Sequence, residues 1–187
     1  MIMLNRTFAV YWKLAIWETA LLIPESEEEL TEIFRRLGAK SPESWARSQV
    51  TEGIPQLLRF LFLQQAWSRI IAEGETSWID REISNAKTHP DRPYAGLGLA
   101  LARCVEKGTG KEDLSEIARC IQARTLFDIG YLIDGPARTT RGLEGLTWGL
   151  FQTDEDRNPI GSQVVGLHES VLELDPTGRE MRPKSDG

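Results

Sequence analysis

Residues 57–71 read LLRFLFLQQAWSRII, and this stretch decides the fold class. Wound as a helix, it is apolar over most of its circumference, with charges at Arg59 and Arg69 alone. Such a helix has to be covered on several sides, so we expect it at the centre of a helical protein. Gly53 and Pro55 break the chain just before it.

Helical patterns with start and stop signals continue on both sides of this stretch. Upstream, Ser26 to Glu29 form a capping box, and Pro42 occupies the first turn of a further helix. Downstream, we expect helices over 78–86, 94–106 and 111–134. The predicted inner face of the last helix consists of Leu114, Ile117, Ala118, Ile121, Leu126, Ile129, Leu132 and Ile133.

The composition changes after Gly142. Residues 147–153 and 160–165 have strand character, and the turn-rich residues 154–159 connect them, which predicts a β-hairpin. Residues 166–174 suit either a short helix or a strand. The expected fold is mainly α, with about six or seven helices. We expect one domain over residues 1–176, with a helical core (1–142), a β appendage (143–176) and a flexible tail (177–187).

Charge is distributed unevenly along the chain. The net charge is −6, and residues 144–187 hold 9 acidic against 4 basic side chains. Phosphate backbones repel a protein with a net negative charge, so we do not expect nucleic acid as a partner. The simplest interpretation of the acidic residues 144–187 is a solvated surface. The more specific interpretation is an acidic face that attracts a basic partner.

The two cysteines, Cys104 and Cys120, do not suffice for a disulfide framework, and we expect a cytoplasmic protein. The apolar stretch from Phe8 to Ile23 is interrupted by Lys13 and Glu18. A bilayer span needs an uninterrupted run of about 20 residues, so we interpret this stretch as a buried element and expect no membrane association.

No cofactor or metal motif is complete. Residues 108–111 read GTGK, but the Walker pattern also needs glycine at 105 and serine or threonine at 112, where Val105 and Glu112 stand. The spacing Asp154-x-Asp156-x-Asn158 resembles the start of a calcium loop, yet Pro159 replaces the required glycine. We therefore expect no cofactor and no metal.

Candidates for acid–base chemistry are Asp128 and His168. Asp128 follows Leu114 and Ile121 at intervals of seven, which predicts a partly buried carboxylate paired with Arg124 one turn earlier. The structural interpretation is an internal ion pair. The functional one is a polar pocket that includes Arg124, Tyr131 and His168.

The loop that carries Arg138 and Arg141 is a candidate anion site, because arginine binds phosphate and carboxylate in bidentate fashion. Pairing with downstream acids is the simpler alternative for this loop.

The absence of a catalytic motif favours a non-enzymatic protein that binds another protein, and we expect that partner to carry a basic surface. An immunity (toxin-neutralising) or adaptor role suits such a chain. The predicted contact residues are Trp148, Phe151, Asp154, Glu155, Asp156 and Leu167. The alternative is a small enzyme or ligand-binding protein with its pocket around Asp128 and Arg124. A homodimer completed by the apolar N-terminal element is a third hypothesis.

Overall fold

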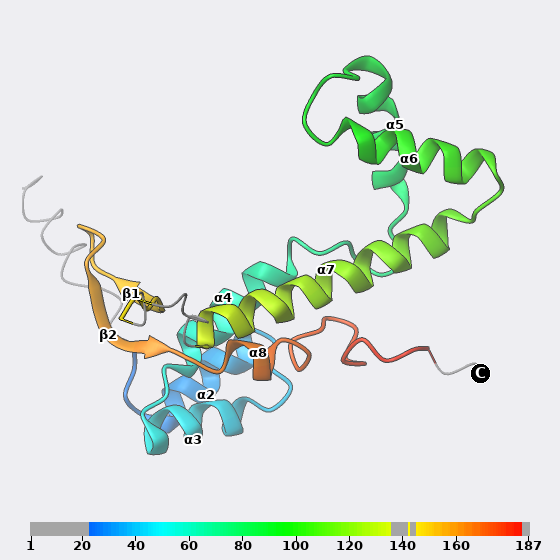
Figure 1. Ribbon diagram of the computed structural model, residues 1–187. Coiled ribbons are helices and arrows are strands. Elements are labelled where there is room, and N and C mark those ends of the chain that lie inside the picture. The colour runs from blue at the N-terminus through cyan, green and yellow to red at the C-terminus, as the bar shows by residue number, and fades with distance from the viewer. Residues whose placement is uncertain (1–22, 136–141, 143–144, 185–187) are drawn as a thin grey trace, which may run out of the picture. The chain divides into compact units, whose positions relative to one another are not determined.

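The computed structural model describes residues 23–135, 142 and 145–184 (Figure 1). These residues hold seven helices and one two-stranded antiparallel sheet, so the predicted mainly helical fold with a hairpin near the C-terminus is confirmed. The bounds are α2 Glu27–Arg36, α3 Pro42–Glu52, α4 Gln56–Trp67, α5 Ser77–Thr88, α6 Ala95–Glu106, α7 Lys111–Asp134, β1 Leu150–Thr153, β2 Pro159–Val164 and α8 Leu167–Ser170.

The chain divides into two compact units, residues 1–53 and 54–187. The single domain over residues 1–176 stays a prediction. The apolar N-terminal stretch lies outside the described residues except for Ile23. Within residues 23–135, 142 and 145–184, no helix combines the length and apolarity that crossing a bilayer requires.

The first unit pairs α2 with α3. The capping box forms as predicted, with the Glu29 amide donating to Ser26 Oγ at 3.2 Å and that hydroxyl donating to the Glu29 carboxylate at 3.0 Å. The rings of Phe34 and Trp45 join the two helices at 5.9 Å between centroids. An exposed ion pair from Arg35 of α2 to Glu43 of α3 adds a contact at 3.0 Å.

The core of the second unit lies where α4, α7, β2 and α8 meet. Its buried members are Leu63, Trp67, Ala123, Val164, Leu167 and Val171. The indole Nε1 of Trp67 donates to the Val171 carbonyl oxygen at 2.7 Å, so the largest side chain of this core also satisfies its one polar atom.

Helix α4 ends at Trp67, four residues before the end of the predicted apolar stretch. The reason is tertiary, because the backbone of Ile71 bonds to α7 instead of continuing the helix. The Ile71 amide donates to Gln122 Oε1 at 2.9 Å, and its carbonyl accepts from Arg119 Nη1 at 2.8 Å.

Helices α5 and α6 form a hairpin around a second core cluster of Trp78, Ile79 and Leu101. They approach closely at Gly98, where a Cβ atom would lie 2.1 Å from the Glu82 carbonyl oxygen. Leu114 and Ala118 of α7 pack against this cluster, which fixes the hairpin to the start of α7.

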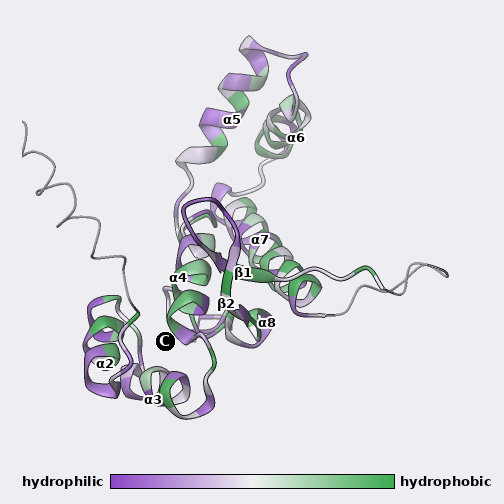
Figure 2. Ribbon diagram, turned by 90° about the vertical axis from the view of Figure 1, so that its left-hand side faces the viewer, coloured by the Kyte–Doolittle hydropathy of each residue, from purple (hydrophilic) through white to green (hydrophobic). Residues whose placement is uncertain are grey.

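The buried face of α7 differs from the predicted inner face. The residues that are buried are Ser115, Arg119, Ala123 and Gly130. The prediction is wrong for Ile117, Ile121, Ile129 and Leu132, which are exposed. Apolar residues lie on more than one side of this helix (green in Figure 2), so periodicity did not identify the side that packs on the core.

The segment after α8 is held by Asp175, a fully buried carboxylate. It accepts hydrogen bonds from the Thr177 hydroxyl at 2.6 Å and from the Met181 amide at 3.0 Å, and it pairs with Arg119. Arg179 also pairs with Glu73. Residues 177–184, predicted as part of a flexible tail, therefore make specific contacts with the rest of the second unit.

Candidate functional site

Trp148 precedes the hairpin and lies half-exposed, with 50% of its surface in solvent. Its indole Nε1 donates to the carbonyl oxygen of Leu132 at 2.7 Å. Leu132 is in the last turn of α7, where carbonyl groups have no partner within the helix. The bond fixes the indole at the end of α7 and leaves much of the ring available to a partner.

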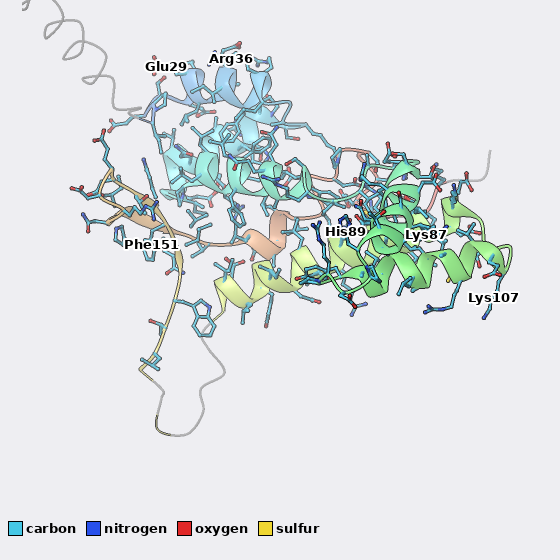
Figure 3. The ribbon with its side chains drawn as sticks, turned by 90° about the horizontal axis from the view of Figure 1, so that it is seen from above. Glu29, Arg36, Lys87, His89, Lys107 and Phe151 are labelled. Carbon is cyan, nitrogen blue, oxygen red and sulfur yellow. The ribbon has the colours of Figure 1, made fainter. Side chains whose placement is uncertain are left out.

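Phe151 lies on β1 (Figure 3). Of its surface, 37% is exposed. Exposure alternates along this strand, and Leu150, its neighbour, packs against the core. The ladder is irregular between Leu150 and Gln152, and irregularities of this kind re-aim a side chain. Phe151 therefore remains a candidate contact residue.

Leu167 does not belong to the exposed surface. It is fully buried in the core cluster at the start of α8, so its predicted role as an interface anchor is wrong. The sequence did not distinguish a helix from a strand over residues 166–174, and the short helix α8 turns this side chain inward.

The acidic turn of the hairpin contains carboxylates with two different roles. Asp154 accepts from the Asn158 amide at 2.8 Å and from the Asn158 side-chain amide at 3.1 Å. These hydrogen bonds lower the pKa of Asp154 and hold the turn. Glu155 and Asp156 are exposed, and they provide the charge that the turn presents to solvent (purple in Figure 2).

Asp128 and Arg124 do not line a buried site. Both side chains are exposed on α7, and no ion pair joins them within the described residues. The predicted partial burial of Asp128 is wrong because the helix packs through the opposite side, which holds Ala123 and Gly130. The other candidate anion site, Arg138 and Arg141, lies outside the described residues.

His168 does have a carboxylate partner, and it is Asp134, the last residue of α7. Oδ2 of Asp134 lies 2.6 Å from His168 Nδ1 and accepts from the His168 backbone amide at 3.0 Å. The Asp134 side chain is 7% exposed and the His168 side chain 26%. Thirty-four residues separate the two, and no motif spacing relates them, so only the fold identifies the pair.

The surroundings of this pair fix the imidazole in place. The rings of Tyr131 and Phe127 meet it edge-on, at 5.0 and 6.0 Å between centroids. Gly130 allows the close approach of the α8 backbone, because a Cβ at this position would lie 3.1 Å from the backbone nitrogen of His168. A carboxylate that accepts from Nδ1–H leaves Nε2 of a neutral imidazole as the acceptor, the arrangement used by general bases.

One atom of the pair lacks a partner. Oδ1 of Asp134 is buried, and no hydrogen bond reaches it from the described part of the chain. A buried acceptor without a donor raises the free energy of the folded state, and such atoms occur at functional sites as well as at structural ones.

A polar cleft of about 440 Å³ lies beside the start of α7. Its basic side chains are already engaged, Arg119 with Asp175, and Arg179 and Lys184 with Glu73. Among the described residues that line this cleft, each cation already has a carboxylate partner, so the cleft does not favour an anionic ligand. In the described part of the chain, no group of three His, Cys, Asp or Glu side chains is arranged to hold a metal ion.

Comparison with known proteins finds no matching family model, no similar curated protein and no similar solved structure. Functional assignment therefore rests on the geometry described above.

Proposed function

We propose that this chain is a protein-binding protein that contacts its partner through the hairpin surface, defined as Trp148, Phe151, Glu155 and Asp156. One observation carries the proposal: an exposed aromatic ring on β1 (Phe151), a second one just before that strand (Trp148) and the exposed carboxylates of the turn lie within one short stretch of chain. Aromatic side chains dominate the energetics of interfaces, and charges around them raise the association rate and selectivity.

The partner of this surface is a protein with a basic face. Complementary charge implies a complex that weakens as salt rises. An immunity or adaptor role in the cytoplasm agrees with this chemistry, and Cys104 and Cys120 are both free thiols.

The test uses a variant that removes charge and keeps the turn. Asp154 stays, since it holds the turn, and Glu155→Gln with Asp156→Asn neutralises the exposed carboxylates. A partner retained by the wild-type chain is identified and purified, and its binding is then titrated at low and high salt. We expect the double variant to bind about tenfold more weakly at low salt and to lose most of the salt dependence.

A matched control removes the same charge elsewhere, through Glu106→Gln with Asp91→Asn, two exposed residues outside the hairpin. The control should bind as the wild type does. Unchanged binding of the hairpin variant at low salt would show that the acidic turn is not the contact, and unchanged binding of Trp148→Ala would show the same for the aromatic part.

A second candidate function, acid–base catalysis by a small enzyme, is favoured by the Asp134–His168 pair. A pocket around Asp128 and Arg124 is not supported for this function, because both side chains are exposed. Diethyl pyrocarbonate modification in a His89→Gln background measures how reactive His168 is. If the Asp134 contact orients the ring so that Nε2 is the acceptor, His168 should be modified faster than His89, and Asp134→Asn should slow this modification. Slower modification of His168 than of His89 would argue for a structural pair.

A further inference from the structure

Helix α7 has a second face whose side chains are exposed in the part of the chain that the structure describes. Its residues are Ile117, Ile121, Arg124, Asp128 and Tyr131, here called the α7 seam. Ile117, Ile121 and Tyr131 are 56%, 61% and 61% exposed. At about 100° per residue, the seam lies roughly opposite the face that packs on the core. Figure 1 shows α7 as a long helix with α4 and α8 beside it.

The spacing of the seam is that of a coiled coil. Successive members follow at intervals of four, three, four and three residues, the alternation by which the a and d positions of a heptad face a second helix. Leu114 would be the preceding member, but it packs against the α5–α6 cluster. The free seam therefore begins at Ile117 and ends in the last turn of α7.

We propose that the α7 seam binds the same seam of a second copy of this chain, with the two helices antiparallel about a two-fold axis. The inference goes beyond the proposed function, because it uses a surface other than the hairpin. A two-fold contact is self-complementary, so one chain supplies both sides of it.

The charges of the seam are complementary to those of the same seam in a second copy, which favours a second copy as the binding partner. With the two-fold axis level with residue 126, Arg124 lies opposite Asp128 of the second copy, and Asp128 lies opposite its Arg124. Ile121 then lies opposite Tyr131 of the second copy on each side of these central ion pairs. All four seam positions around the axis are matched in kind, apolar with apolar and cation with anion.

Other arrangements of the same two helices are disfavoured. A parallel pair would place Arg124 opposite Arg124 and Asp128 opposite Asp128, which is repulsive. If the antiparallel helices slide by one heptad, Asp128 lies opposite Ile117 and Arg124 lies opposite Ile121. Both charges would then lose water at the contact without gaining a charged partner, which is unfavourable. Polar residues in a coiled-coil seam commonly fix direction and register at a cost in affinity.

The test is charge reversal within the full chain, followed by sedimentation over about 1–300 µM, the range in which short interfaces associate. We expect the wild type to form dimers as concentration rises. Arg124→Asp or Asp128→Arg alone places like charges opposite each other twice and should raise the dimer dissociation constant by about tenfold or more. The double variant Arg124→Asp with Asp128→Arg restores opposite charges and should dimerise again.

Two controls separate association from folding. Circular dichroism of each variant reports whether α7 stays helical. Glu106→Arg, on α6, changes charge by the same amount away from the seam and should leave the dimer unchanged. A wild type that stays monomeric over the whole range, single variants that dimerise as the wild type does, or a helical double variant that stays monomeric would each overturn the proposal.

Chemical crosslinking tests the position of the axis. Thr125 lies next to the two-fold axis, so Thr125→Cys, in a chain with Cys104→Ser and Cys120→Ser, should give crosslinked dimers with a short bismaleimide. Thr109→Cys in the same chain is an exposed control outside α7 and should give few. Equal crosslinking at the two positions would contradict the antiparallel contact.

Discussion

The guanidinium Nη2 of Arg119 lies 2.7 Å from the carboxylate Oδ1 of Asp175, and both side chains are buried, 4% and 0% exposed. Arg119 also donates to the Ile71 carbonyl oxygen and lies over the Trp67 ring, 5.4 Å from its centroid. Asp175 accepts from the residues that follow it. This ion pair therefore joins α7, the segment after α4 and the C-terminal segment.

Removing one member of this buried pair leaves an uncompensated charge in the core. Arg119→Ala or Asp175→Ala should lower the free energy of unfolding by about 3–5 kcal/mol. The control pair is Arg182 and Glu180, joined at 2.8 Å on the surface, where either alanine variant should cost less than about 1 kcal/mol. Urea denaturation measures the free energy of unfolding of the variants at both pairs. Similar losses of stability at the buried pair and at the surface pair would contradict the role assigned to Arg119.

Acid should weaken the fold through Asp175. Burial would raise the pKa of this carboxyl, but hydrogen bonds from Thr177 and the Met181 amide, with the Arg119 charge, outweigh it, so the pKa lies below its ordinary value. A carboxyl with a depressed pKa stabilises the fold fully above the unfolded-state pKa of about 4, and this contribution is lost as pH falls through the folded-state value.

The measurement is the free energy of unfolding from about pH 6 down to pH 2. The Asp175→Asn variant should start lower at pH 6 and lose less stability on acidification than the wild type. Parallel pH profiles for the two proteins would show that Asp175 is not a source of the acid dependence.

Two glycines of α6 should respond to alanine in opposite directions. At Gly98 a Cβ would meet the Glu82 carbonyl oxygen at 2.1 Å and the Ala86 Cβ at 2.6 Å, so Gly98→Ala should cost about 1–3 kcal/mol by separating α5 from α6. At Gly96 nothing lies within 4 Å, and Gly96→Ala should stabilise by up to about 1 kcal/mol through helix propensity. Thermal denaturation of the two variants checks the pair, and a shift of the same sign in both would be evidence against the close approach.

Arg157 in the hairpin turn has a φ of 67°, a left-handed conformation that suits glycine better. Arg157→Gly should therefore stabilise the hairpin by up to about 1 kcal/mol. Arg157→Ala removes the same charge without relieving the backbone and should give no such gain. Hydrogen exchange of the β1 and β2 amides reports the difference, and equal protection in the two variants would contradict a strained turn.

The secondary structure was largely predictable because its signals are local. The capping box at Ser26, proline in the first turn of α3 and the acidic turn between two strand-like runs each concern residues within a few positions of one another. Such signals specify where helices and strands start and stop, and they do so before any tertiary contact forms.

The sequence by itself determined a mainly helical chain, a C-terminal hairpin and an exposed acidic turn, because short-range capping, periodicity and turn chemistry encode them. Only the tertiary structure decided which side of α7 is buried, that Asp134 rather than Asp128 accompanies His168, and that Arg119 pairs with Asp175. Those choices depend on contacts between residues tens of positions apart, and on a helix with two apolar faces, where periodicity supports either side equally.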